Sequence, residues 1–243
     1  MPFVRIAAGP GSQRSLMKAM RYRCLIVDHD DTAVDSTAVM HYPAHREAMR
    51  ILRPGRRVVT LQQWFLKNFN PGIMGYLTEE LGFNDQELER EYQIWRSFTE
   101  ARIPRFYPGF IETLIDFRER GGKIAVVSHS EEEIIRRDYG SRNFSPDLIF
   151  GWTTDHSRRK PDPWPVYQVL KILDMEPADA VVIDDLKPGV TMAKRAGISI
   201  AAAGWSHRIP LIERYMRRHC MVYLETIDEL RELLLDASQG GTI

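Results

Sequence analysis

Short apolar runs alternate along the chain with longer stretches in which apolar residues recur every three or four positions. The short runs have the length and composition of buried strands, and the periodic stretches are typical of amphipathic helices. Strands that alternate with helices predict an α/β fold with a parallel sheet and helices on both faces. The predicted strands are residues 24–27, 124–127, 148–150, 180–183 and 198–202, with an edge strand at 221–224.

The alternation stops between residues 36 and 104, where the pattern predicts helices and no strand. Proline and glycine pairs separate these helices, and Asn84 with Glu87 three residues later is typical of a helix start. The sequence therefore predicts helices inserted into an α/β core, with hinges for a lid near 33–36 and 103–108. The predicted helices of the insert lie near 36–52, 60–81 and 85–101.

The predicted domain boundaries follow from this pattern. Residues 36–104 form an all-helical cap, and residues 20–35 together with 105–243 form the α/β core. Residues 1–19 contain a Gly-Pro-Gly-Ser stretch and only a short apolar run that an arginine interrupts, which makes them a poor secretory signal. We expect them to form a loose leader ahead of the core.

Charged and hydroxyl side chains follow the predicted strands. Ligands bind at the carboxyl ends of the strands in open α/β sheets, so these side chains are expected to share one site. Carboxylates that lie together repel one another, and such a cluster needs a compensating partner. The residues are Asp28, Asp30, Asp31 and Thr32 after the first strand, Ser128, His129 and Ser130 after the second, Lys160 after the third, and Asp184 and Asp185 after the fourth.

The chemistry of these groups is complementary. Mg²⁺ takes oxygen ligands and would compensate the carboxylates. A lysine and a serine beside it would hold phosphate oxygens, as phosphoryl transfer requires, and a carboxylate can itself attack phosphorus to form an aspartyl-phosphate. Each group alone is also explained as a turn or cap residue. Their order on successive strands favours a catalytic site.

The composition narrows the class of protein. The 33 Lys and Arg residues balance 33 Asp and Glu residues, which argues against nucleic-acid binding through a general basic field. No run reaches the roughly 18 apolar residues of a membrane span. The two cysteines, Cys24 and Cys220, are expected to be free thiols in a reducing compartment. We expect a cytoplasmic monomer or weak homodimer with no nucleic-acid or membrane partner.

Four segments resemble the motifs of the haloacid dehalogenase superfamily in their usual order. They are "DHDDT" (28–32), "VVSHS" (126–130), "KPDP" (160–163) and "VVIDD" (181–185). The helical insert resembles a cap of the C1 type, and the segments around the later motifs are similar to the phosphoglycolate phosphatase and β-phosphoglucomutase branch. The resemblance covers about residues 22–235. It implies a Rossmann-like core, a Mg²⁺ cofactor and a small phosphorylated metabolite as substrate.

The resemblance also implies a role for each matching residue. Asp28 would be the nucleophile, and Asp30 would be the general acid and base. Ser128 would bind the transferring phosphoryl group, with His129 beside it, and Lys160 would stabilise its charge. The implied Mg²⁺ ligands are Asp28, Asp30 through its backbone carbonyl, Asp184 and Asp185.

The chain departs from the family pattern at two positions. Asp31 stands where the family usually has glycine, and we expect it to pair with an arginine of the cap, the alternative being added charge near the metal. His129 stands where asparagine is common in the family. Contact of His129 with substrate and an ordinary hydrogen bond both remain open.

The insert contains further candidates. His41 and His45 have a metal-ligand spacing, but Pro43 lies between them and no zinc motif surrounds them, so substrate contact by His41, His45 or Arg46 is the favoured interpretation. Several aromatic residues fall at helical spacings and are expected mainly to pack, with one or two lining the substrate site. They are Trp64, Phe65, Phe69, Tyr76, Tyr92 and Trp95.

The sequence favours a Mg²⁺-dependent phosphatase and leaves other functions to be tested. A phosphosugar mutase needs the same aspartates. A dehalogenase would need no metal, which Asp30, Asp184 and Asp185 argue against. A phosphonate hydrolase would need a cap lysine, and Lys67 is the only lysine of the insert. The non-enzyme alternative is a phospho-receiver domain, although such domains are about half as long and lack a helical lid.

Overall fold

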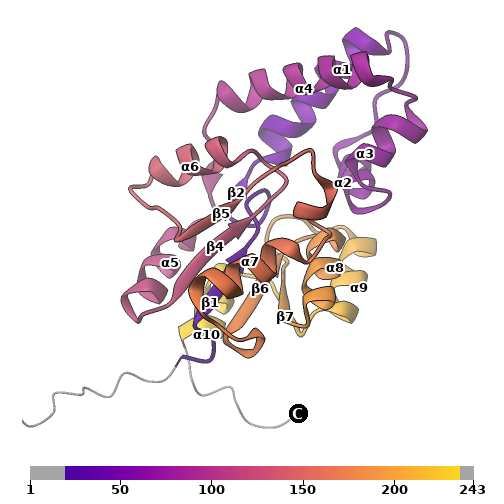
Figure 1. Ribbon diagram of the computed structural model, residues 1–243. Coiled ribbons are helices and arrows are strands. Elements are labelled where there is room, and N and C mark those ends of the chain that lie inside the picture. Colours follow the sequence, from indigo (N-terminus) through magenta and orange to yellow (C-terminus); the bar gives the residue numbers. More distant parts are fainter. Residues whose placement is uncertain (1–19, 236–243) are drawn as a thin grey trace, which may run out of the picture.

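The structure, a computed structural model, describes residues 20–235. The predicted leader, residues 1–19, lies outside the described residues. Six strands form one sheet in the order β5-β4-β1-β6-β7-β8, and all neighbours pair in parallel (Figure 1). This confirms the predicted α/β fold. The strands are β1 (Cys24–Val27), β4 (Lys123–Val127), β5 (Leu148–Phe150), β6 (Ala180–Asp184), β7 (Ser199–Ala203) and β8 (Val222–Leu224).

Helices cover both faces of this sheet because both faces of its strands are apolar. Leu25 and Val27 pack into one buried cluster, with α5, α6 and α10, while Cys24 and Ile26 pack into another, with α7, α8 and α9. Alternate residues of β1 therefore reach opposite layers, as a strand requires. The helices are α5 (Phe110–Glu119), α6 (Glu132–Gly140), α7 (Trp164–Leu173), α8 (Lys187–Ala196), α9 (Pro210–His219) and α10 (Ile227–Leu235).

The insert is helical, as predicted, and lies over the carboxyl end of the sheet (Figure 1). Asn84 and Glu87 form the expected capping box at the start of α4. The predicted helix near 60–81 is two segments, because the chain turns at Asn70, Pro71 and Gly72. The helical elements are a π-helical turn (Thr37–His41), α1 (Tyr42–Leu52), α2 (Leu61–Phe69), α3 (Ile73–Gly75), a second π-helical turn (Tyr76–Glu80) and α4 (Asp85–Glu100).

A two-stranded antiparallel ribbon joins the insert to the core, and the sequence did not predict it. Its strands are β2 (Val34–Asp35) and β3 (Arg105–Phe106), which coincide with the expected hinges. Two residues are too few to show a strand period, so pattern alone could not reveal the pairing. The ribbon fixes where both crossings leave the core.

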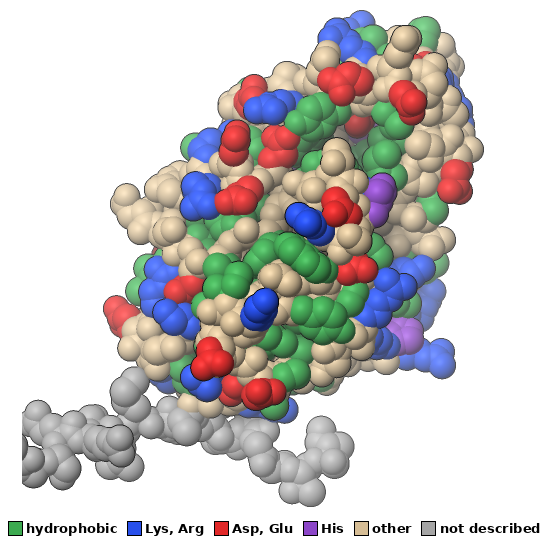
Figure 2. All heavy atoms as spheres, viewed as in Figure 1, with side chains coloured by type: hydrophobic (Ala, Val, Ile, Leu, Met, Phe, Trp, Pro, Cys, Tyr) green, Lys and Arg blue, Asp and Glu red, His purple; other side chains and the backbone are tan. Residues whose placement is uncertain are grey.

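Two features of the described residues bear on partners. No helix within residues 20–235 is long and apolar enough to cross a membrane. On the face seen in Figure 2, basic and acidic side chains are interspersed and form no large field of one sign.

Candidate active site

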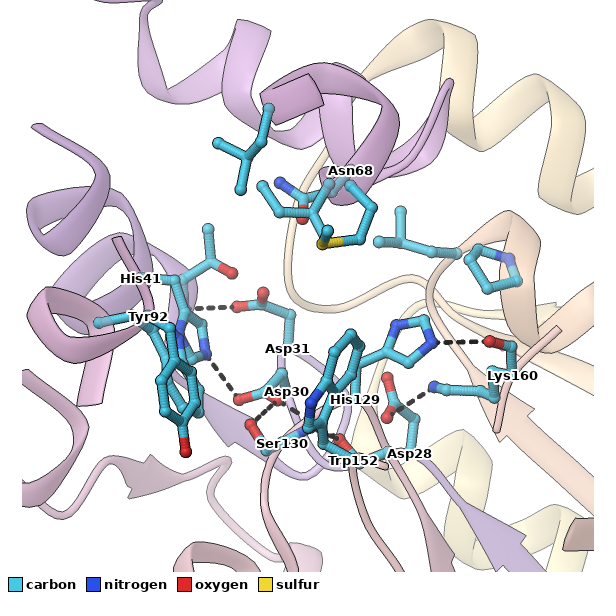
Figure 3. Close-up of a pocket in the computed structure, with 18 of the residues that line it drawn as sticks. Asp28, Asp30, Asp31, His41, Asn68, Tyr92, His129, Ser130, Trp152 and Lys160 are labelled. Atoms are coloured by element: carbon cyan, nitrogen blue, oxygen red, sulfur yellow. Dashed lines mark hydrogen bonds and ion pairs between the residues drawn. The ribbon is translucent and has the colours of Figure 1, made fainter. Parts of the chain in front are cut away.

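Parallel pairing brings polar groups from distant parts of the chain to the carboxyl edge of the sheet. Asp28 follows β1, and its backbone N–H donates to the carbonyl of Ile183 on β6. Asp184 ends β6, and Ser128 follows β4. Figure 3 shows Asp28 with Asp30, Ser130 and Lys160 around one cavity, with dashed lines for hydrogen bonds and ion pairs.

Three buried carboxylates and one buried ammonium form the centre of the site. Oxygens of Asp28, Asp184 and Asp185 all lie within 4.8 Å of one another. Lys160 Nζ lies 2.8 Å from Asp28 Oδ1 and 2.8 Å from Asp184 Oδ2. Burial raises the pKa of Asp184 to about 6, with Lys160 opposing and Asp28 adding to the shift, and burial likewise raises the pKa of Asp185. One lysine is too little positive charge for three carboxylates.

The donor set fits a hard divalent cation. Asp28 Oδ1 is buried and receives no hydrogen bond, although Lys160 Nζ is near it. Carboxylate oxygens are the ligands that Mg²⁺ prefers, and a cation among them would relieve their repulsion. Within residues 20–235, no other group of three His, Cys, Asp or Glu side chains is placed to hold a metal.

The carboxylate of Asp30 is held by side chains from both the core and the insert. Ser36 Oγ donates to its Oδ1 at 2.7 Å and Ser130 Oγ donates to its Oδ2 at 2.6 Å, while Ser128 Oγ lies farther away, at 3.4 Å. His41 Nε2 donates to Oδ1 at 2.8 Å. Burial opposes ionisation, but the charge and hydrogen bond of His41 and the hydroxyl of Ser130 lower the pKa of Asp30 below its usual range.

Trp95 on α4 orients the ring of His41. Its indole N–H donates to His41 Nδ1 at 2.9 Å, and the two rings stack with centroids 6.0 Å apart. An indole N–H can only donate, so this bond favours a neutral ring with its proton on Nε2, facing Asp30, although the charge of Asp30 outweighs burial and raises the pKa of His41. A neutral ring lowers the pKa of Asp30 less than a cation does, while the hydrogen bond remains. His41 is thus the member of the predicted cap group that reaches the reacting carboxylates.

The other predicted cap contacts lie elsewhere. The ring of His45 is buried against Trp64, with centroids 4.1 Å apart, and burial lowers the pKa of His45 to about 4. Arg46 lines a separate pocket on the far side of α1. Lys67 pairs with Glu80 and does not line the central cavity. These placements give no support to a zinc site or to a Schiff-base lysine.

Asp31 is not paired with an arginine, which corrects the expectation from the sequence. Its side chain accepts a hydrogen bond from the backbone N–H of Thr37 at 3.2 Å. Its φ of 55° lies in the left-handed region, which glycine adopts readily and aspartate tolerates better than most residues. Burial, together with the charge of Asp185, raises the pKa of Asp31 to about 7. An added acidic group beside the carboxylates of Asp28, Asp184 and Asp185 is what the structure shows.

His129 makes an ordinary hydrogen bond at the edge of the site. Its Nε2 donates to the backbone carbonyl of Lys160 at 2.9 Å. Burial and the Lys160 charge lower its pKa to about 4, so the ring is neutral near pH 7. His129 thereby fixes the loop that carries Lys160, and the ring also lines the cavity.

Three functional contacts were missed in the sequence. Ser36 and Trp95 act on Asp30 and His41, and His207 Nε2 donates to Asp185 Oδ2 at 3.2 Å. None of these residues lies in a recognisable motif. His207 comes from the loop after β7, and only the folded chain brings it to β6.

The central cavity has a volume of about 780 Å³ and lies between the insert and the core. It is lined by Asp28, Asp30, Ser128, His129, Lys160, Asp184 and Asp185, which are the residues to which the family resemblance gave a role, whereas Thr32 does not line it.

The fold and this site define a hydrolase of a known family. Residues 25–203 match the family described as haloacid dehalogenase-like hydrolase, and the chain belongs to it. This confirms the resemblance seen in the motifs.

Similar proteins carry phosphatase names. Phosphoglycolate phosphatase from Aquifex aeolicus is 28% identical over 192 residues, which cover 76% of this chain and 86% of that protein. Phosphoglycolate phosphatase 1 from Pseudomonas aeruginosa is 25% identical over 231 residues, 91% of this chain and 82% of that protein. A solved haloacid dehalogenase-like hydrolase from Streptococcus pneumoniae shares the fold, with a TM-score of 0.67, 17% identity and coverage of 86% and 97%.

Gly189 on α8 allows the close approach of Asp184. A Cβ at this position would lie 2.1 Å from the Asp184 carboxyl group. We therefore expect Gly189→Ala to displace that carboxylate and to lower kcat by about a hundredfold, as misplacement of a catalytic group by about 1 Å can do. The matched control is Gly140→Ala, where a Cβ meets nothing within 4 Å. Equal kcat in the two variants would contradict this role.

Removal of His41 tests its hold on Asp30. His41→Leu should raise the pKa of Asp30, because a lowering influence is lost. As the pH is lowered, the step that needs ionised Asp30 should then be lost at a higher pH than in the parent enzyme. Turnover near pH 7 should fall by about tenfold, because Asp30 also loses the hydrogen bond from His41. The measurement is the pH profile of turnover. Trp95→Phe keeps His41 and should shift the profile less; an unshifted profile in His41→Leu would refute the coupling.

Proposed function

We propose that this protein is a Mg²⁺-dependent phosphatase that hydrolyses a small-molecule phosphomonoester through an aspartyl-phosphate on Asp28. The observation that carries the proposal is the buried Asp28 carboxylate, which lies beside Asp184 and Asp185 and next to Lys160 in the central cavity. The phosphatase names of the similar proteins support it.

The first step is attack of an Asp28 oxygen on phosphorus. The new O–P bond forms as the bond to the ester oxygen breaks. The negative charge of the bound phosphoryl group raises the pKa of Asp30 above its value in the empty site, and protonated Asp30 gives its proton to the leaving oxygen. Lys160 and the hydroxyl of Ser128 neutralise charge on the equatorial phosphoryl oxygens.

The second step reverses the role of Asp30. Its carboxylate takes a proton from water, and the water oxygen attacks the phosphorus of the aspartyl-phosphate. The O–P bond to Asp28 breaks, and phosphate and the free carboxylate result. His41, Ser36 and Ser130 hold Asp30 in one orientation for both steps.

Mg²⁺, held by Asp28, Asp184, Asp185 and the carbonyl of Asp30, would offset the negative charge of the phosphoryl group and of its ligands. Its place among these residues is supported by the unpaired Asp28 oxygen and the excess of carboxylates.

The test is phosphate release from a panel of phosphorylated metabolites with Mg²⁺. A phosphosugar mutase would instead interconvert phosphate isomers with little net phosphate release. Phosphate release without isomer formation supports the phosphatase. Stable phosphorylation without turnover would favour the receiver-like alternative, and halide release without metal would favour a dehalogenase.

We also propose the domain division and location that the sequence indicates. Residues 36–104 act as a cap that closes on residues 20–35 and 105–243, and the ribbon at the crossings supports this division. Cys24 and Cys220 are free thiols, which suits a cytoplasmic enzyme. A monomer or weak homodimer remains our expectation.

A further inference from the structure

The two walls of the central cavity differ in chemistry. The core wall holds the carboxylates, hydroxyls and lysine described above. The insert contributes mostly apolar and aromatic side chains, and a cavity of about 780 Å³ can enclose a ligand much larger than a two-carbon acid. These side chains are Trp64, Phe65, Ile73, Met74, Leu77, Leu88, Tyr92 and Trp95.

The charged groups on the insert wall are acidic. Asp85, Glu89 and Glu91 line the cavity, and among all described lining residues Lys160 is the one Lys or Arg. Lys160 is already shared between two carboxylates of the core. The cavity therefore offers no second lysine or arginine for an anionic group on the organic part of a substrate, and His41 is already bonded to Asp30.

Three basic residues of the insert have acidic partners of their own. Lys67 pairs with Glu80, Arg53 pairs with Glu87, and Arg96 pairs with Glu100. None of these three basic residues lines the cavity. To reach a bound carboxylate, each of these three would have to leave its partner. Arg90, which lies between Glu89 and Glu91 in the chain, is exposed, donates to Gln93 and does not line the cavity.

Glu91 is the acidic group best placed to select a ligand. It shares one face of α4 with Leu88, Tyr92 and Trp95, and all four line the cavity. Its side chain is partly buried and makes no hydrogen bond or ion pair with any residue in 20–235. Burial raises the pKa of Glu91 to about 7, because no nearby cation compensates its charge, apart from a smaller opposing effect of His41.

The aromatic neighbours of Glu91 also suit a cation. Tyr92 and Trp95 stack with centroids 6.0 Å apart, and aromatic faces attract ammonium groups as well as apolar ones. Figure 3 shows Tyr92 on the side of the cavity opposite Lys160. The phosphoryl end and the aromatic end of the cavity are thus separate.

We propose that the substrate is a phosphomonoester whose organic part is an apolar or aromatic body with an amine, and that Glu91 selects the amine. This inference rests on the proposed phosphatase function. It implies discrimination against phosphoglycolate, the substrate named for the similar proteins, because that ester presents a carboxylate to an acidic and apolar wall.

The experiment compares three phenyl phosphates that differ only in the para substituent: 2-aminoethyl, ethyl and carboxymethyl. We expect kcat/KM to fall in that order, with the amine favoured over the carboxylate by about tenfold to a hundredfold, the range of a hydrogen bond to a charged group. Glu91→Gln should bring the amine-to-ethyl ratio close to one. Glu79→Gln, which makes the same change on the insert outside the cavity lining, should keep the parent ratio.

The outcomes separate the two proposals. If the carboxymethyl ester or 2-phosphoglycolate is hydrolysed better than the amine, or if Glu91→Gln keeps the amine preference, the substrate inference is overturned and the phosphatase stands. If no ester releases phosphate, the phosphatase falls. The substrate inference is then decided by the affinities of Asp28→Asn for the same three esters. These affinities are measured by quenching of the fluorescence of Trp64, Trp95 and Trp152. Tighter binding of the amine supports the inference, and any other order overturns it.

Discussion

Asp28→Asn is expected to form no phosphoryl-enzyme, whereas Asp30→Asn is expected to accumulate one. An amide at position 28 cannot attack phosphorus, so the first bond never forms. An amide at position 30 cannot move a proton, but its backbone carbonyl is unchanged. With an ordinary ester, Asp30→Asn should lose at least the roughly 10²–10⁴ in rate that a general acid or base contributes.

An activated aryl phosphate separates the two steps. Its leaving group departs without a proton, so in Asp30→Asn the first step should largely survive while the water step stays slow. Rapid-quench mass spectrometry of the intact protein should then show a burst and one added phosphoryl group. Asp35→Asn, on the exposed side of β2, is a matched control and should turn over without accumulation.

Two results would contradict these roles. One is a phosphoryl group on Asp28→Asn. The other is Asp30→Asn that hydrolyses ordinary esters at near the parent rate. Asp30→Asn also alters the hydrogen bonds of this side chain with His41 and Ser130, which can lower the stability of the fold. The melting temperature of the variant is therefore measured beside that of the parent.

The sheet and the central carboxylates could be predicted because their signals are local. A buried parallel strand is a continuous apolar run in the sequence. The polar residue that ends it lies at the carboxyl edge of the sheet, where ligands bind, and this position does not depend on the conformation of the loops. The run before Asp28 and the run before Asp184 therefore placed both residues without further information. The observed strands differ from the predicted ones by about one residue at their ends.

The connections between insert and core could not be predicted in the same way. His41 was one of three candidates, and its bond to Asp30 depends on the path of the chain through the ribbon of β2 and β3. Trp95 had an apolar pattern typical of packing, and its N–H contact with His41 depends on how α4 crosses the first turn of the insert. Such contacts join residues far apart in sequence, and no spacing rule encodes them.

Asp31 shows a different limit. A departure from a family motif indicates that something differs locally, but it does not name the partner. The expected arginine was wrong, and the side chain of Asp31 instead accepts a hydrogen bond from the backbone N–H of Thr37. An acidic side chain on a glycine-favoured turn remains buried beside Asp185, which increases the negative charge that a cation would offset.

Removal of divalent metal is expected to abolish turnover and to destabilise the protein. Without a cation, the buried oxygens of Asp28, Asp184 and Asp185 face one another with only Lys160 between them. EDTA should reduce phosphate release to background, and Mg²⁺ should restore it. A ligand present at about a hundred times its Kd stabilises a fold by about 2.7 kcal/mol, so Mg²⁺ should also raise the melting temperature of the EDTA-treated protein by several degrees.

Two comparisons make the metal test specific. Ca²⁺ should raise the melting temperature but support little turnover, because its larger and looser shell does not hold the phosphoryl group in line with Asp28. Asp185→Asn removes one ligand charge and should need more Mg²⁺ for half-maximal activity, whereas the surface variant Asp174→Asn should not. Full activity in EDTA would refute the phosphatase and favour halide release. Activity that needs Mg²⁺ without any thermal shift would place the metal on the substrate instead of on these carboxylates.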